Sequence, residues 1–206
     1  ADFQYFEVKL STMVKSMKKF YLLKRLISEG DLYVYEYKCP EIYDEEYNSG
    51  VSISLTDDII ELFCTDNIEQ TPDYLAGIFS FPIISRRFKE LLIYENIACL
   101  EYHPVRLSCQ KNKEINNSYS FLNILRNIPC FDRNNSEFES GFFRQDVVRK
   151  VKKLSIVEDR IIDRDLVRIA EIPSVILISA RLLDIIVSAK ITGITYQRIE
   201  DFRVPF

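Results

Sequence analysis

The 206-residue chain has no tryptophan, one histidine (His103) and only five glycines. Phosphate-binding loops need glycines at fixed spacing, and neither the dinucleotide fingerprint nor the P-loop pattern occurs. The nucleophile elbow of serine hydrolases and the H-E-x-x-H zinc motif are also missing. One imidazole makes a tetrahedral zinc site improbable, and a structural or exposed role suits His103 better than general-base catalysis. These absences leave an enzyme open, although no motif asks for one, and we expect no metal and no cofactor.

The cysteines show no disulfide or metal-binding pattern. They form an odd set of five without a C-x-x-C pair: Cys39, Cys64, Cys99, Cys109 and Cys130. Most lie within apolar runs, as free buried thiols do. This usage favours a reducing compartment, and we expect a cytoplasmic protein.

Long uninterrupted apolar segments are also missing. The longest, residues 172–191, is interrupted by three charged residues, which exclude a membrane span. Residues 1–16 lack the apolar core and the cleavage site of a secretory signal. We interpret them as an N-terminal extension that could be in part foreign to the natural protein, because Met13 and Met17 could each be a natural start and the sequence from Met17 resembles one.

The overall composition is that of a folded protein. Apolar residues make up 47% of the chain and charged residues 28%, as in globular domains. The length suits one domain with a full core and is too short for two large ones. We expect a single domain over residues 17–206, with an acidic part at residues 31–76 and a repeat-containing part at residues 82–206.

An internal repeat organises the second part. Residues 178–196 repeat residues 84–102 at an offset of 94. Identical pairs include Ser85 and Ser179, Arg87 and Arg181, Ile97 and Ile191, and Tyr102 and Tyr196. In each copy an apolar run ends at the serine, helical spacing follows, and β-branched and aromatic residues then favour a strand. The pattern predicts a strand-helix-strand unit that is used twice.

The two serines mark the predicted helix starts. A serine hydroxyl at this position accepts a hydrogen bond from an amide one turn into the helix. The simplest interpretation makes both copies scaffold. The alternative is a pair of anion-binding sites at helix N-termini, formed by Ser85 with Arg87 and by Ser179 with Arg181.

Charge is distributed unevenly along the chain. Residues 31–76 hold twelve acidic residues and one basic residue, a net charge of −11, whereas the rest carries +7. A solvated face that only keeps the protein soluble is one interpretation. The other is a docking surface, because acidic clusters attract cationic proteins over long distances and repel phosphate. We therefore expect a basic protein partner and no nucleic acid.

Aromatic residues within the acidic segment add contact area of the kind found at interface hot spots. The expected partner contacts are Glu41, Tyr43, Asp44, Glu45, Glu46, Tyr47, Asp57, Asp58 and Glu61.

Alternating patterns predict strands outside the repeats. Residues 20–26 and 32–38 each read as a strand, and residues 51–55 as a short one. Residues 119–125 are expected to form a long-looped hairpin with the strand that ends near Leu107.

Helix-start signals occur at two further points. Thr56 and Thr71 are each followed by acids or proline in the first turn, so we expect helices to begin there. Residues 147–156 carry a small basic cluster, which we assign mainly to solvation. Together the elements indicate an α+β (mixed α/β) fold: a single domain with a mixed or antiparallel sheet and a few helices.

Four segments follow one another in an order shared with a bacterial family: residues 82–92 (PIISRRFKELL), 119–125 (YSFLNIL), 132–138 (DRNNSEF) and 166–196. The chain resembles the immunity proteins of polymorphic toxin systems, in the family numbered eleven among such domains. The resemblance runs from about Met17 to the end and is weakest in the acidic segment. Its polar positions are Ser85, Arg87, Asn123, Ser136, Arg168 and Ser179.

The resemblance implies a non-enzymatic inhibitor that is made beside a toxin gene, stays in the cell and binds the toxin. Contact residues are not carried over, because the acidic segment matches poorly. Two other classes remain open: a small-anion sensor or unrecognised enzyme with a pocket between the two repeat copies, and a structural or homo-oligomeric protein.

Overall fold

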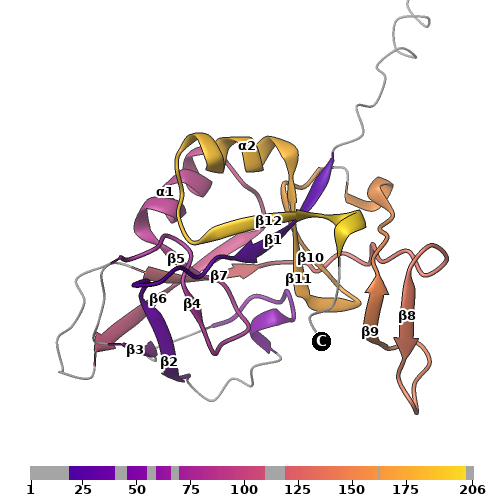
Figure 1. Cartoon of the computed structure of the whole chain (residues 1–206), viewed down its shortest axis with the longest axis horizontal. Helices are drawn as coiled ribbons and strands as arrows, with labels where there is room; N and C mark the ends of the chain where they lie inside the picture. Colours follow the sequence, from indigo (N-terminus) through magenta and orange to yellow (C-terminus); the bar gives the residue numbers. More distant parts are fainter. Residues whose placement is uncertain are drawn as a thin grey trace, which may run out of the picture.

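The computed structural model describes residues 19–39, 46–54, 59–65, 70–109, 119–161 and 163–202. Within these residues, twelve strands form a four-stranded sheet, a six-stranded sheet and a two-stranded hairpin. Two α-helices lie together over the larger sheets, and the hairpin projects at the other end (Figure 1). The arrangement is mostly β-sheet and is compatible with the predicted α+β fold in a single domain.

The four-stranded sheet is antiparallel throughout, with strand order β10–β11–β1–β12. Its strands are β10 (Leu166–Ile169), β11 (Ile172–Ser179), β1 (Phe20–Arg25) and β12 (Ile194–Arg198). In β1, Phe20 and Leu22 are buried and Tyr21 is only partly covered, which follows the two-residue period of a strand. Pairing of β1 with β11 ends at Leu23 and Ile176, whereas pairing with β12 continues to the end of β1. β1 and β11 therefore separate beyond that point.

The six-stranded sheet is mixed, with strand order β4–β2–β3–β6–β7–β5. Its strands are β4 (Ala76–Gly77), β2 (Tyr33–Lys38), β3 (Ile60–Cys64), β6 (Leu100–Cys109), β7 (Tyr119–Ile124) and β5 (Ile83–Ser85). The β2–β4 and β3–β6 pairs are parallel, and the others are antiparallel. All six residues of β7 are buried, so both of its faces are covered. The antiparallel β6–β7 pair confirms the predicted hairpin.

Each helix connects two strands that flank a common third strand. α1 (Arg86–Tyr94) joins β5 to β6, and both of these pair with β7. α2 (Ala180–Ser188) joins β11 to β12, and both of these pair with β1. Neither described helix is long and apolar enough to cross a membrane.

The predicted N-caps of both helices are confirmed. Ser85 accepts a hydrogen bond from the amide of Phe88, and Ser179 accepts one from the amide of Leu182. Each bond satisfies an amide that has no partner within its own helix.

The backbone after each helix also turns in the same way. Asn96 and Lys190, 94 residues apart, have φ angles of 53° and 54°, and Cys99 and Gly193 have φ angles of 63° and 75°. At Gly193 an added Cβ would lie 2.3 Å from the carbonyl oxygen of Tyr74, so this position also lacks space for a side chain. That the two regions are one unit used twice stays a prediction.

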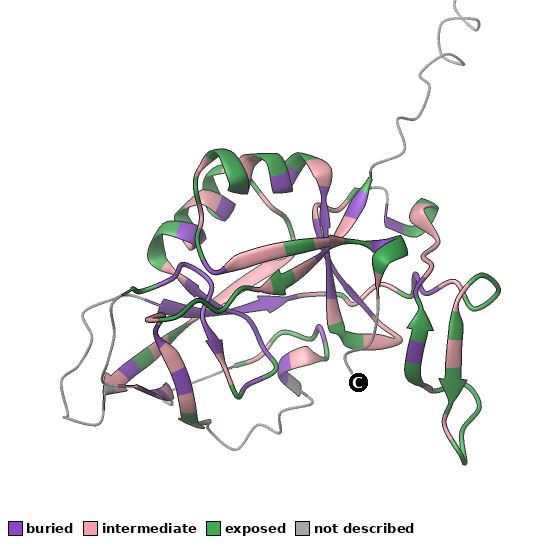
Figure 2. Cartoon of the chain, in the orientation of Figure 1, coloured by how far each residue is buried: buried purple, intermediate pink, exposed green. Residues whose placement is uncertain are grey.

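The hairpin of β8 (Glu137–Ser140) and β9 (Val148–Lys153) stands apart from the two larger sheets (Figure 1). Most of its surface is exposed (Figure 2). The buried side chain of Val151 and the edge-on contact between Phe131 and Phe138, with centroids 5.2 Å apart, attach it to the body. Short 3-10 turns occur at Glu46–Asn48, Glu158–Ile161 and Ile199–Asp201.

Buried apolar residues gather in three clusters. One lies against the six-stranded sheet and is rich in aromatic rings, including Phe81 and Phe121. The second lies beneath the helices and includes Phe88 and Leu182. The third joins the four-stranded sheet to the hairpin and includes Val151.

The helix predicted to begin at Thr56 is wrong in its described part, because residues 60–64 form strand β3. Ile60, Leu62 and Cys64 are buried and the residues between them are not, which is the pattern of a strand. Burial with a two-residue period outweighed the helix-start signal.

Two further local predictions are wrong. The described residues 51–54 are irregular and do not form a strand. No helix begins at Thr71, since residues 71–73 are irregular and Tyr74 bridges to Ile84. The carboxylate of Asp73 accepts hydrogen bonds from distant residues and does not start a helix.

Candidate functional site

Most of the predicted acidic contact surface lies outside the described residues. This applies to Glu41, Tyr43, Asp44, Glu45, Asp57 and Asp58, and to the side chain of Glu46. Their role in binding stays a prediction. The structure places the side chains of the two other predicted contacts, Tyr47 and Glu61.

The prediction of Tyr47 as a surface contact is wrong, because its side chain is 0% exposed. Its ring stacks on Phe81 with centroids 4.8 Å apart and meets Phe121 edge-on at 5.2 Å. Aromatic rings gain both apolar burial and favourable ring geometry in such a cluster. The surrounding acids gave no sign that a 3-10 turn directs this ring into the core.

Two acids of the segment at residues 31–76 pair within the molecule. Glu61 on β3 accepts a hydrogen bond from Arg106 on β6 at 3.1 Å. Asp73 is 6% exposed and pairs with Arg87 at 2.9 Å. The surface therefore carries less negative charge than the count of acids indicates.

An ionic cluster at the start of α1 is built on Asp73. Its carboxylate accepts hydrogen bonds from Ser85 Oγ at 2.6 Å and from Arg87 Nη1 at 2.9 Å. Thr192, which follows α2, donates its amide at 3.0 Å and its hydroxyl at 3.2 Å to the same carboxylate. Asp73 thus ties the beginning of α1 to the segment after α2.

A second ionic cluster, at the start of α2, is built on Asp165. Its carboxylate accepts hydrogen bonds from Ser179 Oγ at 2.6 Å and from Arg181 Nη2 at 2.7 Å. The amide of Ser179 also donates to the carbonyl oxygen of Asp165 at 2.8 Å. The same three residue types therefore surround both helix starts.

The two arginines also link the helices to each other. Arg181 Nη1 lies 3.3 Å from Oε2 of Glu95, the C-cap of α1. Arg87 donates to the carbonyl oxygens of Ala189 and Lys190, just after α2. Each helix therefore places an arginine against the end of the other, where the helix carries negative partial charge. The contacts hold α1 and α2 antiparallel.

These contacts place the four residues of the predicted anion sites in two separate clusters. Each arginine has a carboxylate partner, and each serine caps its helix while donating to an aspartate. Their geometry is explained by a structural role, and anion binding by them stays a prediction. Sequence reasoning missed Asp73 and Asp165; the available signal was an acid twelve or fourteen residues before each serine.

A polar cluster around Glu101 holds residues 52–53 against the six-stranded sheet. The carboxylate accepts hydrogen bonds from Ser52 Oγ at 2.5 Å, Asn123 Nδ2 at 3.1 Å and the amide of Ile53 at 3.4 Å. Burial by itself would raise the pKa of Glu101, but these hydrogen bonds and the neighbouring imidazole outweigh it and lower the pKa.

His103, the only imidazole, approaches Oε2 of this carboxylate, whereas Ser52 donates to Oε1. Its Nε2 is 3.5 Å from Glu101, and its ring stacks on Phe121. In hydrolytic triads the imidazole lies between the nucleophile and the acid, whereas here the acid lies between the other two. The described residues also contain no group of three or more side chains suited to hold a metal ion.

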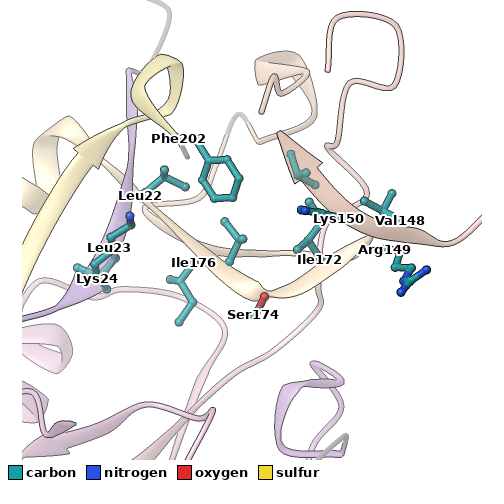
Figure 3. Close-up of a pocket in the computed structure, with 12 residues that line it drawn as sticks. Leu22, Leu23, Lys24, Val148, Arg149, Lys150, Ile172, Ser174, Ile176 and Phe202 are labelled. Atoms are coloured by element: carbon teal, nitrogen blue, oxygen red, sulfur yellow. The ribbon is translucent and has the colours of Figure 1, made fainter. Parts of the chain in front are cut away.

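An open groove of about 500 Å³ lies between the hairpin and the four-stranded sheet (Figure 3). It occupies the region where β1 and β11 separate. Most of its lining is apolar: Leu22, Leu23, Val148, Val151, Ile172, Val175, Ile176 and Phe202. Lys24, Arg149 and Lys150 add positive charge to the lining.

The model of the Imm11 immunity protein family matches residues 23–201, and the chain belongs to this family. The match confirms the resemblance seen in the sequence. No curated protein matches the chain.

Proposed function

We propose that this protein is a cytoplasmic immunity protein that binds a toxin domain encoded beside it. It neutralises the toxin by covering its active surface and catalyses no reaction itself. The observation that carries this proposal is the family match, which spans nearly the whole described fold.

The charge of the chain supports a basic toxin as the partner. The acidic segment at residues 31–76 holds twelve acidic residues and one basic residue, and two of the acids, Glu61 and Asp73, pair within the described part of the molecule. Negative potential raises the association rate with a cationic protein and suits an inhibitor that covers a nucleic-acid-binding cleft.

The proposal is tested by expressing the carboxy-terminal domain of the neighbouring reading frame with and without this protein. We expect growth arrest by the toxin domain alone, recovery on co-expression, and a stable complex in size-exclusion chromatography. Growth arrest that persists despite soluble immunity protein, with no complex formed, would contradict the proposal.

The acidic surface is tested separately, by titration of purified toxin domain. We expect the triple variant Glu41→Lys, Asp44→Lys and Glu45→Lys to bind more than about tenfold more weakly, since close charge pairs across interfaces couple strongly. The matched control reverses three exposed acids elsewhere: Asp159, Asp163 and Asp184. Equal affinities of the two triple variants would remove the acidic segment from the interface.

A further inference from the structure

We propose that the unpaired edge of β9 and the adjoining groove bind an extended segment of the toxin in which carboxylates alternate with apolar side chains. The inference rests on the proposed function, because it takes the toxin as the partner. It adds a second contact surface, distinct from the acidic segment and of opposite charge.

The edge of β9 faces the groove. Among the described strands, β9 pairs only with β8. Its residues 148–151 all line the groove. Successive side chains of a strand point to opposite faces of the sheet, so one face alone could not supply four consecutive residues to the lining. Their presence therefore indicates that the edge of β9 borders the groove. An open edge offers backbone amides and carbonyls to which an extended peptide adds as a further strand.

The groove provides apolar contacts beside that edge. β1 and β11 stop pairing after Leu23 and Ile176, and the space between them is lined by aliphatic side chains and Phe202. Every second side chain of a strand added to β9 would point toward this lining. A volume of about 500 Å³ admits several such side chains.

The charge of β9 selects the occupant. Four of its six residues are basic, and Lys152 lies 3.5 Å from Glu139. Within the described part of the chain, Arg149 and Lys150 form no ion pair, and Lys24 adds a third cation to the groove. A second copy of β9 would place like charges opposite one another, whereas a strand with carboxylates would pair with them. The residues beside β9 therefore suit an acidic segment better than another copy of this chain.

Two aromatic side chains extend this surface at the tip of the hairpin. Phe142 is 83% exposed and Phe143 is 101% exposed. The guanidinium of Arg149 lies 4.4 Å from the ring centroid of Phe142, which joins the tip to the groove lining. Exposed aromatic pairs next to arginine are typical of interface hot spots.

The test is a titration of the toxin domain against three variants of the full chain. We expect Arg149→Glu with Lys150→Glu to weaken binding by about tenfold or more, and Phe143→Ala by roughly tenfold. All three side chains are exposed, so folding should be unaffected. The matched control is Arg86→Glu with Lys89→Glu on α1, which changes net charge equally and should bind like the wild type.

Amide hydrogen exchange gives a second readout. In the complex, we expect the amides of residues 148–153 to exchange more slowly, as added-strand pairing requires. Wild-type affinity of the Arg149/Lys150 variant, or unchanged exchange in β9, would overturn the inference while leaving the proposed function intact. Failure of the wild-type protein to bind the toxin domain would instead overturn the proposed function.

Two other occupants would be recognised in the same experiments. Light scattering that shows a dimer, lost in the Arg149/Lys150 variant, would identify a second copy of the chain. If a variant that ends at Phe202 bound the toxin more tightly, residues 203–206 would be identified as the segment that occupies the groove. Either result would overturn the assignment of the groove to the toxin.

Discussion

At the scale of single residues, Glu101 shows how neighbours decide the state of a carboxylate. Its hydrogen bonds come from Ser52, Ile53 and Asn123, and they lower its pKa against the effect of burial. A carboxyl group whose pKa is lower in the folded state stabilises the fold above its unfolded pKa, about 4.3. That contribution is lost as pH falls through the folded pKa.

We expect Glu101→Gln to lower the free energy of unfolding by about 1–2 kcal/mol at pH 7, because hydrogen bonds to a charged acceptor are weakened. The difference from the wild type should shrink as pH falls below the unfolded pKa and through the lower pKa of the folded state. Urea unfolding followed by tyrosine fluorescence measures both values, since the chain has twelve tyrosines and no tryptophan. If the free energies of unfolding of the wild type and the variant differed equally at pH 7 and at acidic pH, the charge of Glu101 would not contribute to stability.

Gly193 and Cys99 allow the effect of φ to be separated from the effect of space. Both have positive φ, but at Gly193 an added Cβ would also lie 2.3 Å from the backbone carbonyl oxygen of Tyr74. We expect Gly193→Ala to lower the free energy of unfolding by more than about 1 kcal/mol, and the reverse exchange Cys99→Gly to change it by less than that, because a Cβ is already accommodated at Cys99. Thermal unfolding measures both, and similar values would contradict the steric argument.

At the scale of elements, the two helices act as a braced pair. Serine caps, aspartate acceptors and arginines that reach the opposite helix recur at both helix starts. The Asp73 cluster is better buried, since the side chain of Asp73 is 9% exposed and that of Asp165 is 16% exposed. Asp73 also accepts from Thr192, which lies 119 residues away in sequence.

We therefore expect Asp73→Ala to cost about 2–4 kcal/mol of unfolding free energy and Asp165→Ala about 1–2 kcal/mol. The double variant should depart from the sum of the two, because both clusters act on the same helix pair. Denaturant unfolding of the wild type, the two single variants and the double variant measures all four free energies of this double-mutant cycle. A larger loss for Asp165→Ala would contradict the ranking by burial.

At the scale of the whole molecule, charge of opposite sign is found in different regions. The acidic segment at residues 31–76 suits a basic surface, and the edge of β9 suits an acidic strand. A toxin domain that engages both would be held in one orientation, because reversing it would bring like charges together.

Association with the toxin should consequently depend on salt. We expect the association rate to fall by about tenfold when ionic strength rises from roughly 0.05 M to 0.5 M, since the screening length shortens. Stopped-flow mixing measures the rate, and the Glu41/Asp44/Glu45 triple variant should show a weaker dependence. A rate that is independent of salt in the wild type would rule out electrostatic steering.

Local patterns in the sequence were sufficient for several elements. Two kinds of feature could be predicted because they depend on residues within one turn or one strand. These are the alternation in residues 20–26 and 32–38 and the serine caps of both helices. The long-looped hairpin of β6 and β7 followed from the same alternation. Family membership was also readable, because it rests on segments spread along the chain.

Only the tertiary structure decided the burial of Tyr47, the strand at residues 60–64, and the pairing of Asp73 with Ser85, Arg87 and Thr192. These outcomes depend on which distant segments meet, and the spacing of apolar residues along the chain does not predict such contacts. The groove beside β9 likewise forms between β1, β9 and β11, which are far apart in the sequence. Local sequence determined where elements begin and which side chains alternate, whereas long-range packing determined which charges stay free to meet a partner.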